Sequence, residues 1–343
     1  MKTQLILAAA ALAAIQVSCS HDSEVSVPEA TPVTLSVNVG IPKTRLMLEA
    51  NSNADLTANT VQVFVFNALG ELEKSSERVA YGSQISLSVI PGEKTVWAVV
   101  NAPVISGITS LEQFPLAQSN LSDNAPAALV MSGSYTTTVM QSSSIDVTVK
   151  HIAAKVVLDK ITRSFTDPHL VAVPMTLKRI YMSNVAAESN YGCTGVIPQQ
   201  WICKQGVLAS QPQLADLLLD DNLNGDLSEG KTYNTAHTFY VYPNPVEEDS
   251  VDDEWSVRKT RLVLQCDYNG RTCYYPITIP GQGYSGVSTI DRNKVYHISG
   301  LTLTAPGSTD PDKSGPQVSS DVDCTFTVTV SEWEDDIAYE EEF

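Results

Sequence analysis

Residues 32–40 read PVTLSVNVG, and every second residue of this stretch is apolar. The apolar set consists of Val33, Leu35, Val37 and Val39. Successive side chains of a β-strand point to opposite faces, so this alternation predicts a strand with one face on a core and the other in water.

The same period of two returns along the whole chain. It recurs at Ile85/Leu87/Val89, Ile145/Val147/Val149, Met175/Leu177 and Phe326/Val328/Val330. Two further runs, VQVFVFN (61–67) and TVWAVVN (95–101), are apolar on both faces and predict central strands. Helical signal is confined to 111–114 and 212–219. Many short strands with few helices predict an all-β fold of two tandem β-sandwich domains, divided near residue 151.

Composition restricts the function classes. The chain has 343 residues, of which 43% are hydrophobic and 17% charged, as in globular proteins. Its formal net charge of -18 would repel a nucleic-acid duplex, so no nucleic-acid partner is expected.

The first 19 residues, MKTQLILAAAALAAIQVSC, are typical of an export signal. One positive charge at Lys2 precedes an apolar run that is too short to span a bilayer. Cys19 and the polar residues after it resemble the lipobox of bacterial lipoproteins, although Gln16 stands where Leu is usual. We expect a signal peptide over 1–18 and a lipid anchor on Cys19. The alternative is ordinary secretion, with cleavage in the Ala-rich stretch.

Five cysteines follow Cys19, and one pairing has a geometric argument. Asn269-Gly270 is a favoured two-residue hairpin turn, which places Cys266 opposite Cys273 at a distance that a disulfide accepts. Cys193 and Cys203 are the second candidate pair, which leaves Cys324 over. The alternative is that all five are small buried side chains.

The sequence contains no recognisable catalytic constellation, so an enzyme is the least expected class and no cofactor is predicted. A weak calcium candidate lies in DDNLNGDLSEGK (220–231), where Asp220, Asn222 and Asn224 have the spacing of an EF-hand-type loop. Lys231 occupies the position of the bidentate Glu, which favours an ordinary turn and no metal.

A set of strand-like phrases follows in a particular order along the chain: VFVFNALGELEKS (63–75), KTVWAVVNAP (94–103), LVMSGSY (129–135), VTVKHIAAKVVLDKI (147–161), LKRIYMSNV (177–185), RNKVYHISGL (292–301) and FTVTVSEWED (326–335). This ordered set resembles the fimbrillin family of Bacteroidales fimbrial subunits. The resemblance implies two transthyretin-like β-sandwich domains, over 46–150 and 151–343, and export as an outer-membrane lipoprotein. It also implies assembly with other fimbrial subunits, in a homopolymer or a mixed filament, and adhesion to host or bacterial surface ligands.

The resemblance further implies that an arginine-specific surface protease removes a propeptide, residues 19–45. The matching cleavage point is the bond between Arg45 and Leu46. If all four apolar residues of 33–39 are buried, they contribute about 6–12 kcal/mol, at ~1.5–3 kcal/mol each. Their removal would open a groove that a second extended segment can fill by β-strand addition. The alternative is that Arg45 is an ordinary surface arginine.

The candidate donor segment lies near the C-terminus and contains Trp333, Ile337 and Tyr339. We expect 324–333 to be the last strand of the C-terminal domain and 334–343 to be the donor, although Glu340, Glu341 and Glu342 suit a buried face poorly. Two other hypotheses stay open. One is a tip or anchor subunit of the same family. The other is a glycan-binding lipoprotein that never polymerises, with sugars stacked on the aromatic rings of Trp201, Trp255, Tyr240 and Tyr242.

Overall fold

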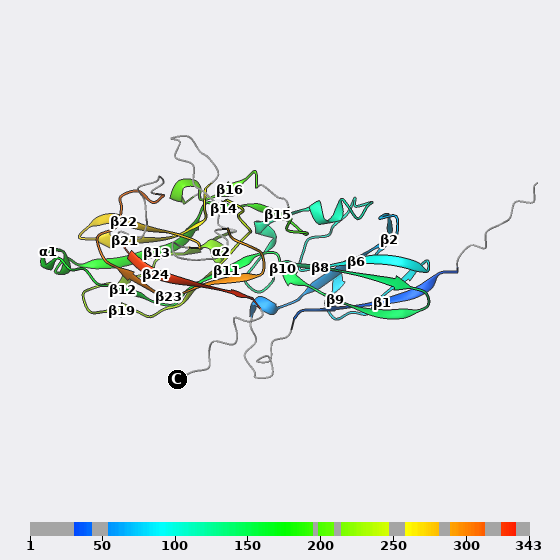
Figure 1. Ribbon diagram of the computed structural model, residues 1–343. Coiled ribbons are helices and arrows are strands. Elements are labelled where there is room, and N and C mark those ends of the chain that lie inside the picture. Colours follow the sequence, from blue (N-terminus) through cyan, green and yellow to red (C-terminus); the bar gives the residue numbers. More distant parts are fainter. Residues whose placement is uncertain are drawn as a thin grey trace, which may run out of the picture. The chain divides into compact units, whose positions relative to one another are not determined.

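Strands dominate the computed structural model, which confirms the all-β prediction (Figure 1). The structure describes residues 31–42, 54–194, 198–208, 214–246, 258–280, 289–312 and 324–333. No helix in these ranges combines the length and the apolar character that a membrane span needs.

The first two sheets are built from residues 33–151 and pack face to face. One sheet has the order β5 (Ile85–Val89), β1 (Val33–Gly40), β9 (Ser143–Thr148). The other has the order β10 (Lys150–His151), β8 (Met131–Val139), β6 (Gly92–Val100), β2 (Thr60–Asn67), β3 (Leu72–Ser75), with β4 (Val79–Ala80) also on β2. Apolar side chains from both sheets meet in one core, for example Leu35 from β1 with Val63 from β2. The arrangement is a β-sandwich.

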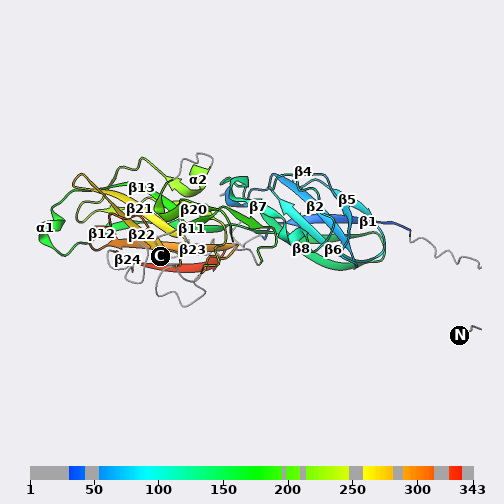
Figure 2. The same cartoon turned by 90° about the horizontal axis from the view of Figure 1, so that it is seen from above.

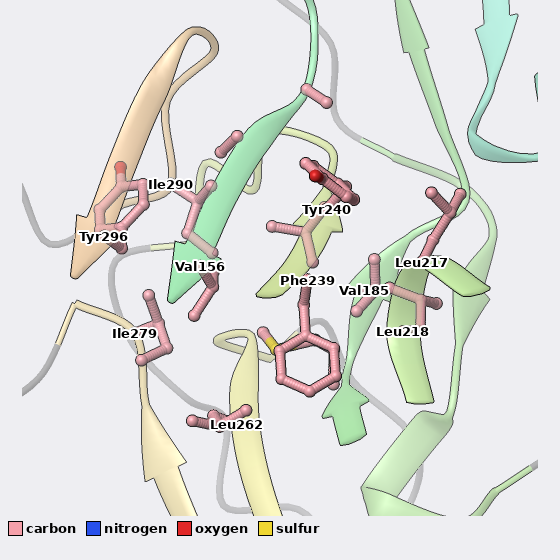
Figure 3. Close-up of a cluster of buried hydrophobic side chains, with 14 of the residues drawn as sticks. Val156, Val185, Leu217, Leu218, Phe239, Tyr240, Leu262, Ile279, Ile290 and Tyr296 are labelled. Carbon is pink, nitrogen blue, oxygen red and sulfur yellow. The ribbon is translucent and has the colours of Figure 1, made fainter. Parts of the chain in front are cut away.

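A second pair of sheets follows in the sequence. One is built around β23 (Lys294–Leu303), which pairs along one edge with β11 (Ala154–Leu158) and then β12 (Ile161–Arg163), and along its other edge with β24 (Cys324–Glu332). β20 (His237–Val241) pairs with β11, and β19 (Thr232–Tyr233) pairs with β12. The other has the order β17 (Leu219–Asp220), β13 (Met175–Ser183), β21 (Arg261–Tyr268), β22 (Arg271–Thr278), with β18 (Gly225–Asp226) on β13. Figure 3 shows Val156, Phe239 and Leu262 gathered in the core that these sheets share.

Short pairings connect segments that are distant in sequence. β14 (Val185–Ala186) pairs with β16 (Trp201–Ile202), and β15 (Glu188–Asn190) pairs with β7 (Gln118–Asn120). The Tyr242 hydroxyl, after β20, lies 2.8 Å from the Ser119 hydroxyl in β7. The described residues from 32 to 333 belong to one unit by their mutual contacts, and the division at residue 151 stays a prediction.

Strand β2 is buried on both faces, as its apolar run predicts. Its odd-numbered valines face the core of the first sandwich, while Phe64 and Phe66 face the opposite way. Phe114 covers this second face, with its ring centroid 4.7 Å from that of Phe64. Burial of both faces therefore depends on the connection between β6 and β8.

The predicted helices differ from the observed ones. Residues 111–114 form no α-helix, because the local turn is a short 3-10 helix at Phe114–Leu116 that contains Pro115. The 212–219 prediction corresponds to the single turn α2 (Ala215–Leu218). An unpredicted turn, α1 (Pro168–Val171), follows Asp167, whose carboxylate accepts a hydrogen bond from the His169 backbone N–H.

A buried arginine supports α1. Arg163, at the end of β12, is only 1% exposed, and its guanidinium lies 4.4 Å from the Phe165 ring centroid. It donates to four backbone carbonyls, those of Leu170, Val171, Val173 and Leu227. These carbonyls face the protein interior, so the guanidinium replaces the donors that water would supply.

Replacing Arg163 with Met should destabilise the protein by at least about 4 kcal/mol, because four carbonyls lose their donor at ~1–3 kcal/mol each. Denaturant unfolding followed by far-UV circular dichroism measures this loss. The matched control is Arg179→Met, which removes a half-exposed ion pair with Asp221 at 3.1 Å and should cost about 0–1 kcal/mol. Equal losses in the two variants would contradict the role of Arg163.

Candidate assembly site around strand β1

Strand β1 is the central strand of its sheet and has a neighbour on each side (Figures 1 and 2). It runs antiparallel to β5, with Leu35 opposite Leu87. It runs parallel to β9, with Val37 opposite Ile145. Loss of β1 would therefore leave unpaired backbone groups on two strands at once. We call the space between β5 and β9 that β1 occupies the β1 slot.

The inner face of β1 is anchored by two fully buried side chains. Leu35 is 0% and Val37 is 3% exposed. Val33 and Val39 pack against the same core but are only half-buried, so the condition for the full ~6–12 kcal/mol, burial of all four residues, is not met. Full burial of two side chains contributes about 3–6 kcal/mol, at ~1.5–3 kcal/mol each, and the flanking valines add less.

The outer face of β1 is polar and forms its own hydrogen bonds. The Asn38 side-chain amide donates to Asp146 Oδ1 at 2.9 Å and to Ser144 Oγ at 3.1 Å, both on β9. The Ser36 and Ser86 hydroxyls lie 3.4 Å apart. Each face of β1 thus has a distinct chemistry, which an incoming strand would have to match.

The Tyr81 hydroxyl, after β4, donates to the Val39 carbonyl at 2.8 Å. This bond lies near the end of β1 that leads towards residue 54. The predicted processing residues, Arg45 and Leu46, lie outside the described residues, as does the predicted lipidation residue, Cys19. A cut between Arg45 and Leu46 would separate β1 from the remainder of the chain, and only non-covalent contacts would then hold it.

The last described strand, β24, lies in the chain's own sheet, as expected for 324–333. β24 pairs with β23 over residues 324–332, so 324–333 belongs to the chain's own sheet. The Trp333 side chain is 2% exposed, and its backbone N–H donates to the Asn293 carbonyl at 3.0 Å. Trp333 is thus buried in the chain's own core. The other two donor residues, Ile337 and Tyr339, lie outside the described residues.

Trp333 is held in a cluster that sequence analysis did not detect. Its ring stacks on His151 with centroids 4.0 Å apart and on Tyr240 at 6.0 Å. The Lys155 ammonium lies 5.9 Å from the Trp333 ring and 3.0 Å from an Asp55 carboxylate oxygen. Asp55 also accepts a hydrogen bond from the Tyr240 hydroxyl, whose pKa is raised by burial and by this carboxylate. The cluster joins β24 to the turn Ala54–Leu56.

The register of the two hairpin cysteines is as predicted. Cys266 lies opposite Cys273, as the Asn269-Gly270 turn requires. Cys266 and Cys193 are both thiols. Burial raises the pKa of the Cys266 thiol, and Cys273 raises it further. A disulfide between Cys266 and Cys273, or between Cys193 and Cys203, stays a prediction.

The weak calcium candidate is disfavoured by the partners of its carboxylates. Asp220, at the first position of the loop, lies 2.6 Å from His237 Nδ1, and Asp226 pairs with Lys231. Hydrogen bonds from Lys231 and Ser228 lower the pKa of Asp226. Asn222 and Asn224 are exposed, and Asn222 has a left-handed backbone with φ of 57°, as in many turns. The described residues contain no group of three or more side chains arranged to hold a metal ion.

The aromatic residues considered for glycan stacking are not surface platforms. Trp201, Tyr240 and Tyr242 are all buried, and Trp255 lies outside the described residues. The Tyr242 hydroxyl accepts from the Asn124 amide at 2.8 Å. These three side chains fill the core, so three of the four residues named in the glycan-binding hypothesis are not available for stacking on sugars.

Two pairs of face-to-face sheets, with β1 central in one sheet of the first pair, define the class of fold. It is the fold of Bacteroidales fimbrial and adhesion subunits, so the resemblance expected from the sequence is confirmed at the level of the fold. No protein-family model matches the chain, and no curated protein matches it either.

Three solved structures illustrate the likeness. A fimbrilin from Porphyromonas gingivalis W83 is similar with a TM-score of 0.62 at 16% identity, over 88% of this chain and 98% of that one. A candidate cell adhesion protein from Parabacteroides distasonis gives 0.61 at 18% identity, over 89% and 100%. The tip fimbrial protein Mfa3 from P. gingivalis, with a C-terminal truncation, gives 0.53 at 13% identity, over 88% and 100%.

Proposed function

We propose that this chain is a structural subunit of surface fimbriae that serves adhesion. In this proposal it is exported as a lipoprotein anchored through Cys19 and cleaved after Arg45 by an arginine-specific surface protease. It then assembles with other fimbrial subunits through the β1 slot. The central position of β1, between β5 and β9, is the observation that carries the proposal.

Physical chemistry supports this role for β1. Loss of an edge strand leaves one neighbouring strand with unpaired backbone groups. Loss of a central strand leaves two such strands, one on each side of the empty slot. The slot also exposes the apolar surface that Leu35 and Val37 cover. A strand that restores both the backbone pairing and the apolar face binds there more strongly than to an ordinary sheet edge.

The fold neighbours support the same function class. Their names describe a fimbrilin, a tip fimbrial protein and a candidate adhesion protein, and none of the three describes an enzyme. The similarity to a tip fimbrial protein keeps a tip or anchor role as the second candidate within this class. Immunogold labelling distinguishes the two, because a tip subunit labels one filament end and a stalk subunit labels the whole length.

Treating the purified full-length precursor with an arginine-specific protease should yield a chain that begins at Leu46. This cut chain should form SDS-resistant ladders when it is mixed with the other fimbrial subunits, because the freed slot can pair with a strand of a neighbouring subunit. N-terminal sequencing and electrophoresis without heating measure the two results. The matched control is Arg45→Gln, which should remain uncut and monomeric. A cut chain that stays monomeric, even when mixed with the other fimbrial subunits, contradicts the proposal.

A further inference from the structure

The β1 slot has a definite side-chain requirement. Its two deepest positions, held by Leu35 and Val37, exclude water and require apolar side chains. The flanking positions of Val33 and Val39 are half-buried and face the same core. A strand that fills the slot well therefore carries four apolar residues at every second position.

The outer face adds a charge requirement at the position of Asn38. Among the residues aligned with β1 on β5 and β9, Asp146 is the only charged one. Asn38 donates its amide to this carboxylate and to Ser144. A hydrogen-bond donor or a cation satisfies Asp146 at this position, whereas a second carboxylate beside it is repelled.

The chain's own candidate donor, EDDIAYEEEF (334–343), does not meet these requirements. Its only consecutive pair of large apolar residues at period two is Ile337 and Tyr339. If these occupy the two deepest positions, Asp335 and Glu341 fall at the flanking positions, whichever way the strand runs.

In both strand directions, an acidic residue of the incoming strand then occupies the position of Asn38. In a strand parallel to β1 the residue there is Glu340, and in the opposite direction it is Asp336. Either carboxylate would lie beside Asp146. Other registers are worse, because they place an acid or Ala338 at one of the deepest positions.

The nearby stretch with four alternating apolar residues is β24, through Cys324, Phe326, Val328 and Val330. This strand is already paired with β23 along its length, and the buried Trp333 holds its end. To act as a donor strand, β24 would have to lose its pairing with β23, so it is not expected to fill the slot of another chain.

We propose that the β1 slot accepts a strand from a different kind of subunit and discriminates against residues 334–343 of a second copy of this chain. The fitting strand has apolar residues at the positions of Val33, Leu35, Val37 and Val39 and a hydrogen-bond donor or a cation at that of Asn38. This rests on the proposed function, since it names the partner of the same slot. The chain is then a component of mixed filaments.

The test uses the full-length chain cut after Arg45 and three labelled peptides in excess. These are β1 itself (PVTLSVNVG), the same peptide with Asn38→Asp, and EDDIAYEEEF. Co-elution in gel filtration and native mass spectrometry measure exchange into the slot. The β1 peptide should exchange in, the Asn38→Asp peptide should bind roughly 3–10-fold more weakly, as for like charges across strands, and EDDIAYEEEF should bind at least about 100-fold more weakly.

Asp146→Asn provides the matched variant, because it removes the repelling charge and leaves the apolar face unchanged. In this variant the β1 and Asn38→Asp peptides should bind equally, and added salt should no longer affect the difference between them. If EDDIAYEEEF binds the unaltered chain as tightly as the β1 peptide, the inference is overturned. If the β1 peptide itself does not enter the slot, the result contradicts the proposed function, which requires strand exchange at this slot.

Discussion

Replacing Leu35 with Asp should expel β1 from its slot in the uncut chain. Leu35 is fully buried in the core of the first sandwich, so the change removes about 1.5–3 kcal/mol of apolar burial and also buries a carboxylate. A buried charge without a partner costs several kcal/mol more. The lost burial and the buried charge together approach the ~3–6 kcal/mol that burial of Leu35 and Val37 contributes. The Leu35→Asp chain should therefore open its slot without any cleavage and form oligomers when mixed with the other fimbrial subunits, while retaining most of its β-structure.

Size-exclusion chromatography with light scattering measures the oligomers, and hydrogen exchange measures the loss of protection in β5 and β9. The matched control is Thr34→Asp, which places the same charge one residue away on the exposed face. That variant should remain monomeric and lose less than about 1 kcal/mol. A Leu35→Asp chain that stays monomeric, with β5 and β9 still protected, would show that β1 is not needed to close the sheet.

Replacing Trp333 with Ala should destabilise the protein by about 3–5 kcal/mol, the usual cost of removing a large buried aromatic side chain. The change leaves a cavity between His151 and Tyr240, on which the indole stacks. It also removes the ring beside Lys155, and so weakens the link between β24 and Asp55. Denaturant unfolding followed by far-UV circular dichroism measures the loss.

Trp333→Phe is the matched control, since it keeps an aromatic ring in the cluster. The Trp333 indole N–H has no hydrogen-bond partner among the described residues, so its removal leaves no other group unsatisfied. We expect a loss of about 1 kcal/mol or less, from the smaller ring alone. An alanine variant as stable as the unaltered protein would contradict the anchoring role of Trp333.

Local patterns predicted the features that depend on neighbouring residues in the sequence. The period of two at Val33 to Val39 predicted strand β1, and the Asn269-Gly270 turn predicted the Cys266 and Cys273 register. Backbone geometry sets both, because side-chain alternation and two-residue turns need no distant partner. The α1 turn was missed, although Asp167 and Pro168 form a recognisable helix start.

The aromatic residues show where such reasoning fails. Trp201, Tyr240 and Tyr242 were considered as an exposed sugar-binding surface, and Trp333 as part of a donor segment, but all four are buried. A period of two specifies which residues share a face of a strand, but not whether another sheet covers that face. Burial depends on distant segments, such as Asp55 beside Tyr240 and His151 beside Trp333.

Composition and periodicity alone establish an acidic, strand-rich chain, the strict alternation of residues 33–39 and an acidic segment after β24, and they lead us to expect an export leader. These are properties of the linear chain, so they can be read without knowing which segments pack together. The central position of β1, the closeness of Asp146 to Asn38 and the burial of Trp333 in the chain's own core became known from the folded structure. Strand order and charge proximity arise when segments more than 100 residues apart pair across a sheet, and no local pattern encodes that choice.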